Sequence, residues 1–243
     1  MPKTFFIDLT KCTACRGCQV ACKQWNKLPA EQTIQRGTHQ NPADVSVSTY
    51  KLVRFSEKEQ GGKIKYVFFP DQCRHCLIPP CKEVGDGFVE NAVTQDPKSG
   101  AVVFTAATAK FSDDQKQEVL ESCPYNIPRY EKGKGGPMAK CTMCFDRQAE
   151  GMVPACVKSC PTGTMNFGER GDMLALAKKR LAEVKKSKPK AQLLNPEDVN
   201  VVYLVEEDPK LYHEWAVAEA SLPGPMTRKQ FFAKVFGPAR SLA

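Results

Sequence analysis

The chain has 243 residues, of which 42% are hydrophobic and 26% are charged, a composition typical of a globular protein rather than a disordered one. Its formal net charge is +8, yet no base-stacking or groove-reading motif accompanies the positive charge, so we expect no binding to nucleic acid. No apolar run approaches the roughly 18 residues that span a bilayer, so we expect no transmembrane segment.

The amino-terminal third is predicted to contain three strands and one short helix. Residues 5–9 read as a strand, residues 20–25 as a short helix, and the polar residues 28–43 as a long loop. Alternating apolar residues predict a strand at 46–55, which a glycine pair connects to a second strand at 64–69. No secretory signal is expected, because the first residues lead directly into the first strand.

The rest of the chain alternates helical and strand patterns. Residues 89–93 and 100–104 are predicted to form a hairpin, and residues 112–121 a helix that begins at a serine or aspartate cap. A short helix and a turn are expected between the cysteines at 144 and 156. Three further predictions concern the carboxyl-terminal part: an amphipathic helix at 172–188 capped by Asp172, a strand at 201–205, and a helical apolar stripe at 227–236.

Twelve cysteines dominate the chemistry of the sequence. The first four, at 12, 15, 18 and 22, have the C-x2-C-x2-C-x3-C spacing of bacterial [4Fe–4S] ligation. In that motif the first three thiolates hold one cluster, and the fourth ligates a neighbouring one. A disulfide scaffold is typical of short secreted chains, and zinc explains C-x2-C pairs but neither three cysteines two residues apart nor the two Cys-Pro pairs. We therefore predict iron–sulfur clusters.

The cysteine loops carry further expectations. We expect Gly17 to let the backbone turn close to a cluster, and Pro79-Pro80 to force an extended path before Cys81. His75 lies between cysteines, and we expect it to support the ligands or to lie at the surface rather than to bind iron. Arg147 is expected to be structural, bonding backbone carbonyls near a cluster.

The cysteine groups look like diverged copies of one unit, a strand followed by a cysteine loop and a short helix. Pseudo-twofold symmetry pairs the first group with the last, and each then lends one cysteine to the other. Three complete sets result: Cys12, Cys15, Cys18 and Cys160; Cys22, Cys141, Cys144 and Cys156; and Cys73, Cys76, Cys81 and Cys123.

A protein with four clusters of this type would have further cysteines at four positions where this chain has none. They are occupied by Gly85, Asp113, Lys116 and Val119. By the exchange rule these four positions would be the ligands of one cluster. We therefore predict that one cluster has been lost and that three [4Fe–4S] clusters remain.

Three motifs resemble the iron–sulfur subunits of the molybdopterin oxidoreductase superfamily: C-P-Y-N-I-P-R at 123–129, K-C-T-M-C-F-D-R at 140–147 and P-A-C-V-K-S-C-P-T-G at 154–163. The whole chain, including the cysteine-free stretch at 173–186, is similar to the small subunit of the soluble formate dehydrogenases of sulfate-reducing bacteria. The resemblance implies an α+β, ferredoxin-like fold with two pseudo-repeated cluster-binding units. Residues 1–168 would form the iron–sulfur domain, and residues 169–243 an extension that docks on this domain and on a partner subunit.

The same resemblance implies an electron-transfer subunit without catalytic residues of its own. Its partner would be a catalytic alpha subunit with a tungsten or molybdenum pterin cofactor, and its acceptor a soluble cytochrome c. Export on the partner's twin-arginine signal would take the pair to the periplasm, with the cytoplasm as the alternative. The alternative function is the equivalent subunit of a molybdopterin oxidoreductase that acts on tetrathionate, polysulfide, sulfoxide or nitrate.

Overall fold

The computed structural model of the protein describes residues 2–218. The helical stripe predicted at 227–236 lies outside these residues. Among the described residues, no helix combines the length and the apolar character that crossing a membrane would require.

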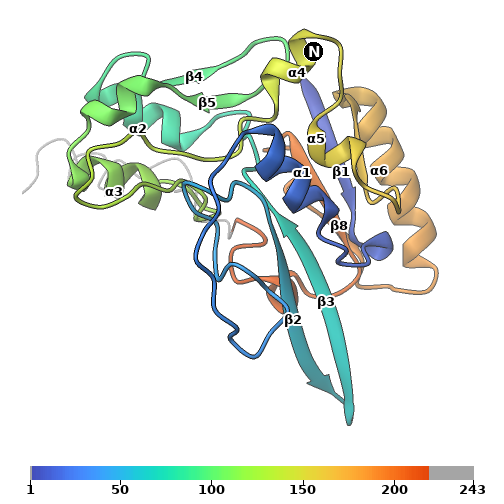
Figure 1. Ribbon diagram of the computed structural model, residues 1–243. Helices are drawn as coiled ribbons and strands as arrows, with labels where there is room; N and C mark the ends of the chain where they lie inside the picture. Colours follow the sequence, from blue (N-terminus) through green and yellow to red (C-terminus); the bar gives the residue numbers. More distant parts are fainter. Residues whose placement is uncertain (1, 219–243) are drawn as a thin grey trace, which may run out of the picture.

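A four-stranded sheet forms the centre of the molecule (Figure 1), with the strand order β6-β1-β8-β7. Strand β1 pairs in antiparallel fashion with β6 and in parallel with β8, and β7 runs antiparallel to β8. The strands are β1 (Lys3–Asp8), β6 (Met165–Glu169), β7 (Gln192–Leu194) and β8 (Val201–Val205). β7 and β8 lie beyond residue 168. The predicted iron–sulfur domain (1–168) and the predicted extension (169–243) therefore both contribute strands to one sheet. The boundary at residue 168 stays a prediction.

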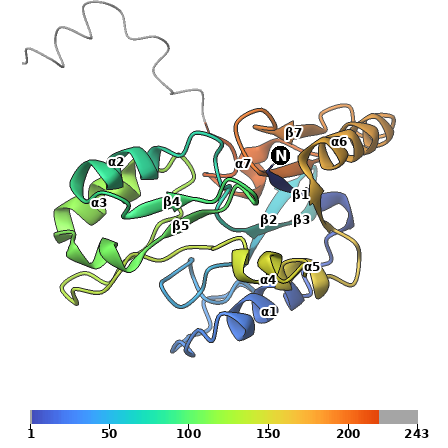
Figure 2. The same ribbon diagram turned by 90° about the horizontal axis from the view of Figure 1, so that it is seen from above.

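The two faces of β1 serve different parts of the fold. Successive strand residues point to opposite faces, and so Phe5 packs in the buried cluster that contains Cys18 and Cys156, whereas Phe6 packs against the helix α6 (Arg170–Lys185). Seen from above, α6 lies on one side of β1 and the helices α1 (Gly17–Trp25) and α5 (Ala155–Lys158) lie on the other (Figure 2). The loops that lead into α1 and out of α5 therefore lie on the face of the sheet opposite α6.

Two similar units carry the cysteine loops. In the first, α1 contacts α5 beside the β1–β6 pair. In the second, at the left of Figure 1, two helices contact each other beside a short antiparallel strand pair. The second unit consists of α2 (Pro80–Phe88), β4 (Val93–Gln95), β5 (Val102–Phe104) and α3 (Asp113–Glu121). The predicted α+β fold with two pseudo-repeated units is confirmed.

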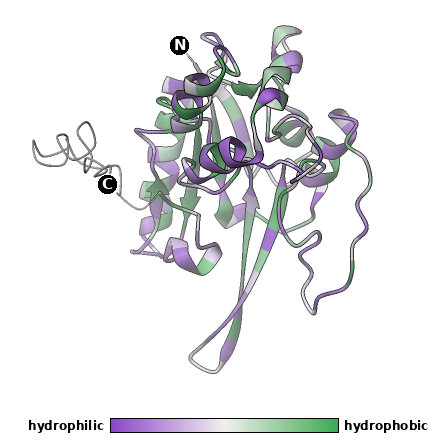
Figure 3. Ribbon diagram, turned by 90° about the vertical axis from the view of Figure 1, so that its left-hand side faces the viewer, coloured by the Kyte–Doolittle hydropathy of each residue, from purple (hydrophilic) through white to green (hydrophobic). Residues whose placement is uncertain are grey.

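A long hairpin of β2 (Leu52–Gln60) and β3 (Lys63–Asp71) extends away from the rest of the molecule (Figure 3). Its inner end packs against the central sheet, where the ring of Phe69 stacks on Tyr203 at 4.5 Å between centroids. The Tyr203 hydroxyl donates a hydrogen bond of 2.8 Å to the Pro70 carbonyl oxygen. The hairpin thus fixes the residues that follow it, which lead into the second cysteine group. Short elements complete the described fold: η1 (Leu9–Lys11), η2 (Ala106–Lys110), α4 (Phe145–Ala149) and α7 (Pro209–Tyr212).

Some predicted boundaries were wrong. The first helix begins at Gly17 rather than at residue 20, and it contains both Cys18 and Cys22. The strand expected from residue 46 begins at Leu52. The helix α2 begins at Pro80, where the sequence predicted an extended path before Cys81. Proline is in fact favoured in the first turn of a helix, where its missing N–H costs nothing.

Candidate iron–sulfur centres

The three C-x-x-C loops share one backbone geometry. The residue before the second cysteine is left-handed in every loop, with φ of 55° at Ala14, 46° at His75 and 61° at Met143. This conformation is uncommon for residues with side chains, and it clusters at functional sites. In two loops the amide of that residue donates to the sulfur of the first cysteine, with N···S distances of 3.4 Å for His75 and 3.3 Å for Met143. The recurrence supports a common origin for the loops.

Gly17 has only part of the role that the sequence suggested. The left-handed residues of the first loop are Ala14 and Arg16, and Gly17 begins α1 without a positive φ. A Cβ atom on Gly17 would lie 3.4 Å from the carbonyl oxygen of Ser159 and 3.7 Å from the Cys15 sulfur, which are ordinary contact distances. Gly17 therefore lies close to a predicted cluster ligand, but the turn expected at Gly17 is made by its neighbours.

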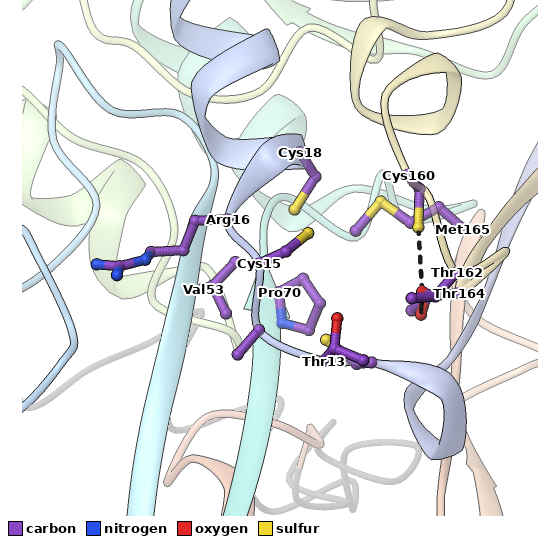
Figure 4. Close-up of a pocket in the computed structure, with 12 residues that line it drawn as sticks. Thr13, Cys15, Arg16, Cys18, Val53, Pro70, Cys160, Thr162, Thr164 and Met165 are labelled. Atoms are coloured by element: carbon purple, nitrogen blue, oxygen red, sulfur yellow. Dashed lines mark hydrogen bonds between the residues drawn. The ribbon is translucent and has the colours of Figure 1, made fainter.

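The first predicted set of cysteines lines a single cavity. Cys12 follows η1, Cys15 lies in the loop, Cys18 is in the first turn of α1, and Cys160 follows α5. Figure 4 shows the sulfurs of Cys15, Cys18 and Cys160 on different walls of this cavity. Their separation in sequence is bridged by the contact between α1 and α5.

The second set is drawn together at the other side of α1. Cys22 is buried, and its thiol lies close enough to Cys141, Cys156 and Cys144 for the charge of each to raise its pKa, after burial itself. Cys18 and Cys22 are four residues apart on one helix, yet each faces a different group of cysteines. Two left-handed residues in sequence, Met143 and Cys144, place the second cysteine of this loop.

The third set lines a second cavity. Cys73 and Cys76 lie in the loop after β3, Cys81 is in the first turn of α2, and Cys123 follows α3. Within the described part of the chain, the structure thus brings together the same three groups of four cysteines that the spacing predicted.

Burial opposes the ionised form of these thiols in the protein chain alone. It raises the pKa of Cys12 and Cys123 to about 11, and that of Cys81, Cys141 and Cys156 to about 12. A cysteine binds metal as the thiolate, so a strongly cationic group must supply the energy of deprotonation. Iron ions shared among four sulfurs meet this requirement.

Cys160 is the exception in its set. Burial acts to raise its pKa, but hydrogen bonds from the backbone at Met165 and from Thr162 outweigh burial and lower it. The Thr162 hydroxyl lies 3.7 Å from the Cys160 sulfur, the contact drawn as a dashed line in Figure 4. Donors of this kind stabilise negative charge on sulfur and are one of the means by which proteins tune iron–sulfur clusters.

The spacing of the sulfurs does not suit a single metal ion. A zinc ion requires its ligands to converge at about 2.0–2.3 Å from one point. Among residues 2–218, no group of three His, Cys, Asp or Glu side chains converges in this way. Four sulfurs line each of two cavities, which is the number of thiolates that a [4Fe–4S] cluster requires.

The three sets follow one another in a row. Cys18 of the first set and Cys156 of the second pack in one buried cluster, and Cys73 of the third set and Cys141 of the second pack in another. The second set thus shares a buried cluster with each of the other two and lies between them.

The four positions without cysteines lie in or beside a region of apolar packing. Val119 and Lys116 are fully buried on α3, and a Cβ atom on Gly85 would lie 2.8 Å from a methyl carbon of Val93. Val93 and Val119 belong to one buried cluster with the ring of Phe111. Apolar side chains thus fill space beside the positions that a further cluster would need for its ligands.

Two other expectations can be compared with the structure. His75 is buried rather than at the surface, and its Nδ1 accepts a hydrogen bond of 3.0 Å from the amide of Val102. Arg147 donates to the Val153 carbonyl oxygen at 2.8 Å and lies over the ring of Trp25, which confirms a structural role.

The sequence reasoning missed two buried lysines near the cysteines. Lys140 precedes Cys141 directly, so its place in the motif was a usable signal. Lys51 lies before β2, far in sequence from most of the cysteines, and nothing in the local pattern marked it as buried.

The comparisons with known proteins also indicate [4Fe–4S] clusters. A family model described as a 4Fe-4S dicluster domain matches residues 64–170. The chain is 54% identical to the formate dehydrogenase 2 subunit beta (cytochrome c-553) of Nitratidesulfovibrio vulgaris, over 89% of this chain and 99% of the relative. It belongs to the family of formate dehydrogenase beta subunits.

More distant members extend the family. The formate dehydrogenase subunit beta of Megalodesulfovibrio gigas is 52% identical, over 90% of this chain and 100% of the relative. The nitrate-inducible iron–sulfur subunit of the Escherichia coli formate dehydrogenase is 36% identical, over 85% of this chain and 70% of the relative. This beta subunit therefore shares its framework over nearly the full length with relatives from sulfate-reducing bacteria.

Proposed function

We propose that this beta subunit carries electrons within a formate dehydrogenase, through three [4Fe–4S] clusters held by the three sets of cysteines. The observation that carries the proposal is the arrangement of twelve cysteines as three groups of four in a row, with the second set in the middle. The three relatives described above are each named as a formate dehydrogenase subunit, and these names are the reason for proposing formate as the substrate.

The residues of the chain would act by holding and shielding the clusters. The four sulfurs of each set would be the ligands, and the apolar side chains around them would limit the access of water. A bound [4Fe–4S] cluster takes up and releases one electron at a time, at a potential that depends on burial, charge and hydrogen bonds to sulfur. The amides of His75 and Met143 and the hydroxyl of Thr162 would supply such hydrogen bonds.

Formate oxidation would take place in a catalytic alpha subunit, where formate yields carbon dioxide, one proton and two electrons. This beta subunit would perform no bond chemistry itself. Support comes from the relatives' names, which describe beta or iron–sulfur subunits of the enzyme rather than the whole enzyme. Tungsten or molybdenum in a pterin cofactor would serve the partner.

A soluble cytochrome c is our proposed acceptor, and the periplasm the proposed location, reached together with the partner. The name of the Nitratidesulfovibrio vulgaris relative includes cytochrome c-553, which supports this acceptor. Cell fractionation tests the location: the chain should be found in the periplasm when it is produced with the alpha subunit and in the cytoplasm when it is produced alone. Export of the chain without its partner would contradict shared export.

The electron-transfer function is tested on the complex purified without oxygen. Addition of formate should reduce the iron–sulfur clusters of the beta subunit, which electron paramagnetic resonance (EPR) spectra would detect. It should also support the reduction of a cytochrome c. An alpha subunit that reduces the cytochrome equally fast without the beta subunit would contradict the proposal. Signals that respond to tetrathionate, polysulfide, sulfoxide or nitrate but not to formate would instead favour the alternative enzyme.

A further inference from the structure

Two lysines are buried among the cysteines and have no carboxylate partner in the part of the chain that the structure describes. Lys51 is 1% exposed and Lys140 is 5% exposed. Neither ammonium pairs with a carboxylate within residues 2–218. A buried charge is costly unless an opposite charge or several hydrogen bonds compensate it. The compensating charge for both lysines must therefore come from groups that are not carboxylates.

Lys51 lies at the junction of the first and second sets. Its ammonium donates to the Pro70 carbonyl oxygen at 3.4 Å and to the side-chain oxygen of Gln72. Pro70 lines the cavity of the first set. Burial raises the pKa of both Cys18 and Cys156, and on each of them the Lys51 charge is the strongest influence in the opposite direction. The ammonium thus faces one cysteine from each of two neighbouring sets.

Lys140 occupies the corresponding junction between the second and third sets. Its ammonium donates to the carbonyl oxygens of Val102 and, at 3.3 Å, of Cys141. Lys140 and Val102 both line the cavity of the third set. Burial raises the pKa of Cys81 to about 12, and the Lys140 charge is the strongest opposing influence. Lys140 also acts on Cys141 of the second set.

A third buried cation in this region is different. The guanidinium of Arg74 is fully buried beside Cys73, but it forms an ion pair of 2.8 Å with Asp71. Asp71 also pairs with Arg54, which pairs in turn with Asp44, so the charge of Arg74 is partly offset within a network of ion pairs. Lys51 and Lys140 keep their full charge, and their hydrogen bonds to carbonyl and amide oxygens fix where that charge lies.

We propose that Lys51 and Lys140 are potential-setting residues, each a fixed cation shared by two adjacent clusters, which raises the reduction potential of both. This inference rests on the proposed function. Reduction adds one negative charge to a cluster, and a nearby cation in a weakly screened interior favours the state with more negative charge. A cation between two clusters acts on both, so the second cluster, which faces both lysines, receives a shift from each.

The test is a redox titration of the assembled complex, monitored by EPR. Lys51→Met keeps the length of the side chain but removes the charge, and it should lower the midpoint potentials of the first and second clusters only. Lys140→Met should lower those of the second and third clusters only. We expect at least a tenfold fall in the equilibrium constant for reduction at each affected cluster, which corresponds to about 59 mV for one electron.

Two controls separate charge from packing. Lys51→Arg and Lys140→Arg keep the charge. The potentials of these variants should differ from those of the wild type by only a fraction of the shift that the methionine variants cause. Lys116→Met removes a fully buried lysine whose ammonium lies over the ring of Tyr130, and it should move none of the three potentials. If the methionine variants hold all their clusters at unchanged potentials, or if all three potentials shift equally, the inference is wrong while the proposed function stands. A wild-type complex without reducible clusters would overturn both.

Discussion

At the scale of single residues, Cys22 tests the arrangement of the ligands. It is four residues from Cys18 on α1, yet its sulfur lies among Cys141, Cys144 and Cys156. Cys22→Ala should therefore damage the second cluster and leave the first with all four ligands. EPR spectra of the variant should show the same lesion as those of Cys144→Ala.

The reciprocal variant provides the control. Cys160 lines the cavity with Cys12, Cys15 and Cys18, so Cys160→Ala should change the signal of the first cluster and spare the second. If Cys22→Ala gave the same spectrum as Cys15→Ala, the exchange of cysteines between the two groups would have to be abandoned.

The cysteine groups could be predicted at this scale because ligand spacing constrains the backbone strongly. Cysteines separated by two other residues can bind the same cluster only if they lie on a tight loop. The fourth cysteine of each motif then ligates the neighbouring cluster, which pairs the loops. Lys51 could not be predicted in the same way, since its burial depends on the packing of β2 and β3 against the central sheet. The turn expected at Gly17 was misplaced, because Ala14 and Arg16 adopt the left-handed conformation instead.

At the scale of secondary structure, elements with a strong local signal were predicted and short ones were missed. The helix α3 begins with a capping box at the serine cap that the sequence predicted. The side chains of Ser112 and Gln115 each accept a hydrogen bond from the other residue's backbone amide. The strand β8 is an unbroken apolar run and is completely buried. By contrast, β7 and α7 contain three and four residues, too few for a periodic pattern, and they form only because the sheet and the hairpin provide partners.

The helix α2 offers a prediction at the same scale, through its two glycines. A Cβ atom on Gly85 would lie 2.8 Å from a methyl group of Val93, a stiff β-branched side chain. Gly85→Ala should therefore overpack the second unit and lower the free energy of unfolding by about 1–3 kcal/mol. Chemical unfolding of the assembled complex, followed by loss of the iron–sulfur absorbance, measures the change.

Gly87 is the matched control on the same helix. It has no neighbouring atom within 4 Å of the position of a Cβ atom. Gly87→Ala should stabilise the protein by about 0.5–1 kcal/mol, because alanine restricts the unfolded chain more than glycine does. Equal effects of the two substitutions would mean that the tight contact with Val93 does not exist in solution.

At the scale of the whole molecule, two cluster-binding units share one chain, and only the first is completed by a large sheet. The second unit has the short pair β4 and β5 and a compact apolar core of its own. That core includes Val93, Phe111 and Val119 beside the positions where a fourth cluster would need ligands. With three clusters, as we propose, this packing would give the second unit the stability that a further cluster would otherwise supply, because apolar burial would replace metal ligation.

The proposed number of clusters predicts the iron content of the molecule. Three sets of four cysteines should bind about 12 iron atoms and as many sulfide ions per chain. The fourth place offers Gly85, Asp113, Lys116 and Val119, of which only the aspartate could bind iron, and its carboxylate accepts a hydrogen bond from the amide of Gly133. Anaerobic iron and sulfide analysis of the purified beta subunit, corrected for the iron of the alpha subunit, measures the content. A value of about 16 would mean that ligands other than cysteine hold a fourth cluster, and that the apolar cluster of the second unit rearranges to admit it.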